Sequence, residues 1–206
     1  MLVALVAFTL AAAVLTITPG VDTAMVLRAA AAEGPRAGAA AGLGVCAGLF
    51  VWGAGAAFGL SALLAASATA FVALKWVGAA YLVFLGLRLL ARPRAKLDLG
   101  PGGEPRGARD ALRRGFLTNV LNPKVGVFYA TFLPQFIPAG ASVAAFSLLL
   151  AGVHAVLTLI WFALLVALTV PLGRFLKRPR VVRAMDRLTG GVFIAFGAKL
   201  ALSPRG

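Results

Sequence analysis

The sequence is too apolar for a protein that folds in water. Of its 206 residues, 61% are hydrophobic and only 13% are charged, and the mean hydropathy is +0.97, which predicts an integral membrane protein. The formal net charge of +14 would suggest a nucleic-acid partner in a soluble protein. Here the basic residues are concentrated between apolar stretches, which argues against nucleic acid.

Six apolar stretches of spanning length follow one another along the chain. A membrane-spanning helix needs roughly 20 such residues, so the stretches predict an all-α fold with six transmembrane helices in the lipid bilayer. They cover residues 2–18, 38–64, 71–90, 116–133, 143–170 and 189–202.

The first stretch is interrupted by Pro19 and Gly20, with Asp22 two residues beyond. Proline removes a backbone donor and clashes with the preceding turn. In hydrocarbon such a break persists only where protein or a watery cavity satisfies the freed carbonyls. Two interpretations are open for Asp22: it binds a substrate ammonium or a proton within the membrane, or it caps a following helix at the cytoplasmic interface.

A polar stretch at residues 92–114, rich in glycine and proline, divides the chain near its middle. It is typical of a linker, and we predict a first three-helix repeat at 1–91, a basic cytoplasmic linker at 92–111 and a second three-helix repeat at 112–206. Residues 78–84 (GAAYLVF) align with 190–196 (GGVFIAF). Because each half has three helices, the second crosses the membrane with opposite polarity, which predicts an inverted repeat.

The fourth stretch carries the matching break at Pro123, preceded by Asn119 and Asn122 and followed by Lys124. Paired interruptions in corresponding places of two halves indicate a transporter's binding site near the bilayer midplane. In that interpretation the two amides and the restarted helix hold a substrate carboxylate. In the alternative the amides only cap the break and contact neighbouring helices. Lys124 meets the carboxylate, pairs with Asp22 or extends to the surface.

The basic residues lie in alternate loops, between the third and fourth helices and between the fifth and sixth, whereas the turns at 65–70 and 134–142 have no charge. Loops rich in Lys and Arg stay in the cytoplasm. We therefore predict that the loops after helices one, three and five are cytoplasmic and that both termini face outward.

Other residues that could carry chemistry are few. Cys46, the only cysteine, has no partner for a disulfide, and Asp22, Cys46 and His154 on different helices are a poor set of metal ligands. His154 relays protons or, in the interpretation we favour, makes a hydrogen-bonded helix contact. Phosphate-binding loops and hydrolase motifs are absent from the sequence, so we expect no enzyme, no cofactor and no metal site, and transport driven by an ion gradient.

Three segments of the chain resemble the LysE/RhtB family of bacterial amino-acid exporters. One departure is Val21, which stands where the family usually has a second proline. The segments that carry the resemblance are Thr18-Pro19-Gly20 with Asp22; GAAYLVFLG at 78–86; and Gly115-Phe116 through Asn119, Asn122-Pro123-Lys124, Phe128 and Pro134-Gln135-Phe136.

This resemblance implies a six-helix protein of the bacterial inner membrane that exports amino acids or close relatives in exchange for protons, as a homo-oligomer. Asp22, Asn119, Asn122 and Lys124 are then the candidate residues for substrate and proton binding. Two alternatives stay open: an exporter of metal cations or other small metabolites from the same superfamily, and a membrane scaffold that transports nothing.

Overall fold

A computed structural model describes residues 1–66, 68–93, 107–168 and 178–202, and within these ranges the chain is entirely helical. The all-α prediction is therefore confirmed. Both prolines that were expected to break a helix do so: α1 (Leu2–Ile17) and α2 (Val21–Glu33) are separated by residues 18–20, and α5 (Gly107–Val120) and α6 (Pro123–Val127) by residues 121–122. The axes of α1 and α2 differ by 52°.

The remaining helices continue each half of the chain. After Gly34, whose φ of +93° suits glycine, α3 runs from Pro35 to Ala66, and α4 covers Ala68–Ala91. After α6 the helix widens into a π-helical turn, η1 (Phe128–Phe132), and then tightens into a 3₁₀ turn, η2 (Leu133–Phe136). α7 (Val143–Ala167) begins with a cap in which the Ser142 hydroxyl accepts from Ala145 N at 3.3 Å.

The last helix is longer than its apolar stretch predicted. α9 extends over Pro179–Leu202, so Arg180, Arg183 and Arg187, which were expected in a loop, lie on its first half. The physical reason is an amphipathic pattern: Val182 and Asp186 are fully buried, whereas Arg183 between them is half-buried and Arg180 and Arg187 on either side are exposed. Likewise α5 begins at Gly107, inside the predicted linker. The division into two halves stays a prediction.

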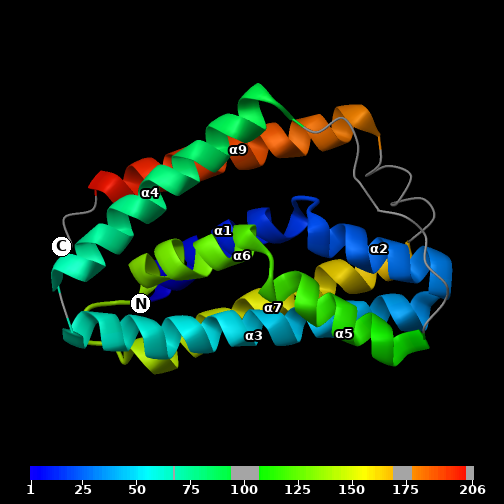
Figure 1. The fold of residues 1–206 in the computed structure, drawn as a ribbon, viewed down its shortest axis with the longest axis horizontal. Coiled ribbons are helices and arrows are strands. Elements are labelled where there is room, and N and C mark those ends of the chain that lie inside the picture. The colour runs from blue at the N-terminus through cyan, green and yellow to red at the C-terminus, as the bar shows by residue number, and fades with distance from the viewer. Residues whose placement is uncertain (67, 94–106, 169–177, 203–206) are drawn as a thin grey trace.

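The helices form three layers (Figure 1). α4 and α9 lie side by side on one face, α3, α5 and α7 pack together on the other, and α1, α2 and α6 lie between them. Glycines permit the closest contacts: a Cβ at Gly86 would lie 2.6 Å from the Gly190 carbonyl oxygen, and one at Gly115 would overlap Ala41. Each of these contacts joins a helix of the first predicted half to a helix of the second.

Two helices of the described chain are long and apolar enough to cross a membrane, α3 over Pro35–Gly59 and α7 over Val143–Ala167, and the bent pair of α1 and α2 gives a third if it is one span. The full set of six predicted spans is not confirmed. Large apolar side chains such as Phe58, Val77 and Ile160 are exposed on the outer surface, where lipid would cover them.

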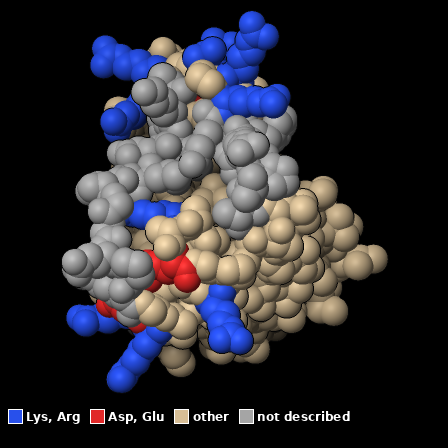
Figure 2. Space-filling model, turned by 90° about the vertical axis from the view of Figure 1, so that its right-hand side faces the viewer, with Lys and Arg blue, Asp and Glu red and all other residues tan. Residues whose placement is uncertain are grey.

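Basic side chains gather at one end of the molecule. This end is formed by the last turns of α2 and α7 and the first turns of α3, α5 and α9. Viewed end-on, it carries many Lys and Arg side chains around a smaller group of Asp and Glu (Figure 2). We call this end, marked by Arg36, Arg109, Arg113 and Arg180, the basic end.

Candidate functional site

The two breaks meet through Asp22. This residue lies in the first turn of α2, and its Oδ2 accepts a hydrogen bond from the Asn119 amide at 3.0 Å and from the Asn122 amide at 3.0 Å. Asn119 is fully buried near the end of α5, and Asn122 precedes α6. The alternative in which Asp22 caps α2 is wrong, because Gly20 occupies the N-cap position. The structure therefore joins the acidic residue of one break to both amides of the other.

Each asparagine also has a second contact that fixes its orientation. The Asn122 side chain caps α6, since its Oδ1 accepts from the backbone N–H of Lys124 at 3.0 Å. The Asn119 side chain packs against α3, where a Cβ on Gly48 would lie 2.6 Å from its Oδ1. The backbone carbonyl of Asn119 accepts a hydrogen bond from the Trp52 indole at 3.2 Å, whereas its side-chain Oδ1 is buried without a partner in the described chain. Sequence reasoning gave Gly48 and Trp52 no part in the site, and their relevance depends on the packing of α3 on α5.

Lys124 lies at the second break, and its side chain forms hydrogen bonds to the first. Its ammonium donates to the carbonyl oxygens of Leu15 at 3.2 Å and Thr18 at 3.4 Å. Both are carbonyls that lose a helical partner when α1 ends at Ile17. A cation at this position also complements the negative end of the helix dipole. This capping role was not among the three roles predicted for Lys124.

A cavity with about 350 Å³ of empty space, counting its open mouth, lies between the breaks and α7. Its polar wall carries Asp22, Asn119, Asn122, Lys124 and Thr158. The second carboxylate oxygen of Asp22, Oδ1, is buried and has no hydrogen-bond partner in the described chain. Leu15, Val45, Leu49, Val125 and Phe162 are the large apolar residues of the lining.

His154 also lines the cavity, but its ring is engaged within the protein. Its Nδ1 lies 3.2 Å from the Tyr129 hydroxyl, and the two rings stack with centroids 5.8 Å apart. Tyr129 is fully buried. This pair matches the favoured interpretation of His154 as a hydrogen-bonded helix contact. Cys46 is buried beside the pair, with its thiol 3.7 Å from the Ala155 carbonyl oxygen.

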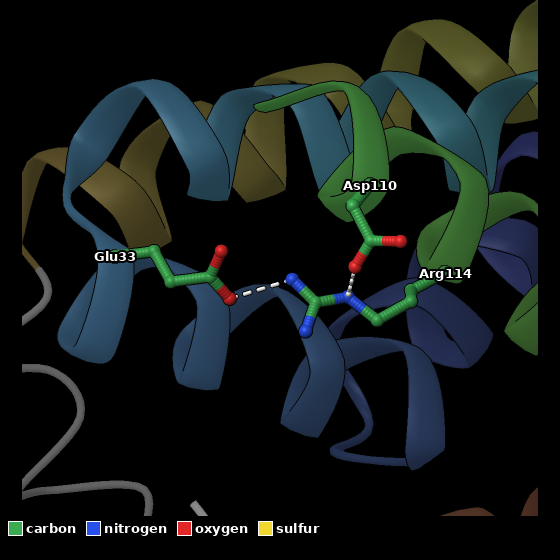
Figure 3. A network of polar contacts seen from close by, with 3 residues as sticks. All are labelled: Glu33, Asp110 and Arg114. Carbon is green, nitrogen blue, oxygen red and sulfur yellow. Dashed lines mark hydrogen bonds and ion pairs between the residues drawn. The ribbon is translucent and has the colours of Figure 1, made fainter. Parts of the chain in front are cut away.

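An ion network holds together the two helices that carry the site, close to the basic end. Arg114 of α5 contacts Glu33, the last residue of α2, at 2.5 Å, and Asp110 one turn earlier on α5 at 3.1 Å (Figure 3). The Glu33 side chain is only 6% exposed, so this contact is partly shielded from solvent. Together with the Asp22 contacts, it ties α2 to α5 at two levels.

Within the described ranges, His, Cys, Asp and Glu form no group of three that could hold a metal ion.

Comparison with known proteins matches nearly the whole chain. The family model described as LysE type translocator covers residues 13–204. An uncharacterized membrane protein of Bacillus subtilis, YrhP, is 32% identical over 97% of this chain and 99% of its own length. No solved structure matches.

Two relatives are named for what they export. A homoserine/homoserine lactone efflux protein of Salmonella typhi is 30% identical over 95% of this chain and 94% of its own. A leucine efflux protein of an Enterobacter species is 28% identical over 91% of this chain and 90% of its own.

Proposed function

This chain belongs to the family of LysE type translocators, and from that premise we propose that it is a secondary transporter that exports amino acids or close derivatives from the cytoplasm, by exchange for protons. Relatives at about 30% identity named as homoserine and leucine efflux proteins support the substrate class. The observation that carries the proposal is the meeting of two proline breaks at one carboxylate, Asp22, beside a cavity.

The proposed membrane arrangement is six helices in two inverted three-helix repeats in the bacterial inner membrane. In this arrangement α1 with α2, and α5 with α6, count as one broken helix each. The gathering of Lys and Arg at the basic end supports placing that end in the cytoplasm. The loops after helices one, three and five are then inside and both termini are outside.

Asp22 is the proposed alternating group of the site. As a carboxylate it binds the substrate ammonium, and it takes up a proton after the substrate leaves. Burial of a carboxylate is costly unless it is paired or protonated. A charged Asp22 with neither a substrate ammonium nor a proton bound is therefore disfavoured. Substrate export is then coupled to proton entry, because the substrate ammonium and the proton compete for the same Oδ1 and Oδ2 atoms of Asp22.

Asn119, Asn122 and the start of α6 are the proposed carboxylate site. In the structure both amides donate to Asp22, and the first N–H of α6 donates to Asn122 Oδ1. A substrate carboxylate therefore reaches these donors only when Asp22 turns toward the substrate ammonium or is protonated. Lys124 contributes positive charge at the same place.

The packing suggests which parts move to switch access. Rigid rocking of one predicted half against the other would break the glycine contacts between Gly86 and Gly190 and between Gly115 and α3. We assign the movement instead to the pair of α4 and α9 against the other helices, which keeps both of these contacts and, among the described glycine contacts, separates only the one between Gly78 of α4 and Thr131 of η1. This pair reaches the first break, because the hydroxyls of Thr189 and Thr18 are hydrogen-bonded at 2.5 Å.

The proposed exchange is energetically adequate. One proton entering as one neutral substrate leaves gains about 2.3 kcal/mol per 100 mV of membrane potential. This corresponds to about a fiftyfold outward gradient at equilibrium, and a pH difference adds to it.

The proposal is tested by measuring amino-acid efflux from cells fed a mixture of dipeptides, with and without the protein. A rise of one or a few amino acids in the medium is expected, abolished by collapsing the proton gradient. If none rises although the protein is verified in the membrane, amino-acid export is contradicted, and metal cations and other small metabolites are then screened. Tolerance of substitutions at both breaks would favour a scaffold.

A further inference from the structure

One buried hydroxyl in the cavity has no partner. Thr158 of α7 is only 3% exposed, and its Oγ1 makes no hydrogen bond in the described chain. Five threonines in helices or directly after one donate their hydroxyls to the carbonyl four residues earlier, whereas Thr158 does not. These are Thr9, Thr16, Thr18, Thr131 and Thr189. A buried polar atom left unpaired is costly, and because Thr158 lines the cavity, a molecule bound there can supply the missing partner.

The position of Thr158 follows from the antiparallel packing of α3 and α7. A Cβ on Gly42 would lie 3.3 Å from Phe162, and the Cys46 thiol contacts the Ala155 carbonyl, so Thr158 lies at a level between Gly42 and Cys46. Gly48, which contacts Asn119, is about one turn farther along α3. At 1.5 Å per residue, Thr158 and the level of Asn119 are therefore about 5 Å apart along the axis.

Water alone is a poor partner for this hydroxyl. A buried water typically makes about three hydrogen bonds to polar groups, whereas Val45 and Phe162, at the level of Thr158, are apolar. Two other acceptors of the cavity lining lack a partner in the described chain, Asp22 Oδ1 and Asn119 Oδ1. Asp22 Oδ1 is assigned above to an ammonium. Because about 5 Å separates the two levels along the axis, a single small molecule with its ammonium on Asp22 can reach Thr158 with its side chain.

We propose that the Thr158 hydroxyl is a specificity-determining contact of the export site, where it hydrogen-bonds a neutral polar group, such as a hydroxyl, on the substrate side chain. The proposal rests on the proposed function and narrows its substrate class. A charged side chain is disfavoured at this level, because Val45 and Phe162 offer it neither counter-charge nor donors. An apolar side chain is accepted but leaves the Thr158 hydroxyl unpaired.

The test compares efflux of L-homoserine and L-leucine from proteoliposomes containing wild type, Thr158→Val or Thr158→Ser. Valine keeps the shape of threonine and removes the hydroxyl, so the ratio of homoserine to leucine efflux should fall about tenfold, the effect of one hydrogen bond. Thr158→Ser should stay within about twofold of wild type. Thr158→Ala is a second variant without the hydroxyl if Thr158→Val accumulates poorly.

Ser147→Ala is the matched control. Ser147 is also on α7 and buried with an unpartnered hydroxyl, but it does not line the cavity, so its loss should leave the ratio unchanged. An unchanged ratio in Thr158→Val, or an equal fall for both substrates, overturns the proposal and leaves the export function standing. If the wild-type protein exports leucine but not homoserine, the proposal is likewise overturned and the export function stands. If wild type exports no amino acid, the proposed function itself has failed, and this proposal with it.

Discussion

The two proline breaks differ in how they satisfy their backbone groups. The second is capped by its own residue, because the Asn122 side chain accepts from Lys124 N. The first has no side-chain cap at Gly20. Of its carbonyls, Val14 O accepts from Thr18, whereas Leu15 O and Thr18 O depend on the Lys124 ammonium.

The first break therefore depends on contacts from the second. Lys124 caps α1, and Asn119 and Asn122 hold Asp22, so the second break supplies both the cation and the amides that the first requires. Val21 adds to the contrast, since nothing at that position stiffens the backbone as a second proline would. The second break is a local motif, and the first is completed only by folding against it.

The largest effect is expected from removing the acidic group of the first break. Asp22→Asn keeps the size of the side chain but carries neither negative charge nor an exchangeable acid proton. Export driven by a pH gradient should fall at least about a hundredfold, because two charged interactions are lost at once, while folded protein stays in the membrane. Flux in proteoliposomes measures this.

Asp110→Asn is the matched control for that change. Asp110 is a partly exposed partner of Arg114 near the basic end, so its loss should leave transport within about twofold. Undiminished proton-coupled flux in the Asp22→Asn protein would remove Asp22 from the mechanism.

Substitution of Lys124 tests whether the first break depends on the second. Lys124→Met leaves the Leu15 and Thr18 carbonyls without their donor and should lower the free energy of unfolding by about 1–3 kcal/mol. Lys124→Arg retains the charge and the donors and should lose less. The midpoint of thermal unfolding in detergent reports both variants. Equal stability of Lys124→Met and wild type would show that the first break does not need the second.

The placement of Asn119 is tested through α3. Gly48→Ala puts a Cβ 2.6 Å from Asn119 Oδ1, which must shift Asn119 relative to Asp22 and should cost about 1–3 kcal/mol of stability, with reduced transport. Gly55→Ala is the control on the same helix, because a Cβ there meets nothing within 4 Å. If both variants behave alike in unfolding and flux assays, contact between α3 and Asn119 does not position the site.

The smallest effect is expected from the local cap. Asn122→Ala removes the N-cap of α6, which should cost about 0.5–2 kcal/mol, and one of the two amides on Asp22. The apparent KM for export should rise, since Asn119 still holds the carboxylate. Wild-type KM in this variant would assign Asn122 to capping alone.

Several features of the site could be predicted from the sequence because each is a local property of the chain. A proline stops a helix wherever it stands in one, so the breaks at Pro19 and Pro123 were placed correctly. An acid and two amides in apolar segments require partners, which identified Asp22, Asn119 and Asn122 as candidates. The predicted start of the last helix was wrong. The arginine-rich segment at the start of α9 resembles a loop in composition but forms an amphipathic helix.

Partnership between residues far apart in the chain was decided by the tertiary structure. Nothing near Lys124 in the sequence indicates that it caps α1, since that contact spans more than 100 residues. The roles of Gly48, Trp52 and Thr158 likewise depend on which helix packs against which face. Composition and proline placement thus determined a helical membrane protein with two breaks. Which polar groups meet, and which buried hydroxyl lacks a partner in the described chain, followed only from packing, because hydrogen bonds require distances that a linear pattern does not contain.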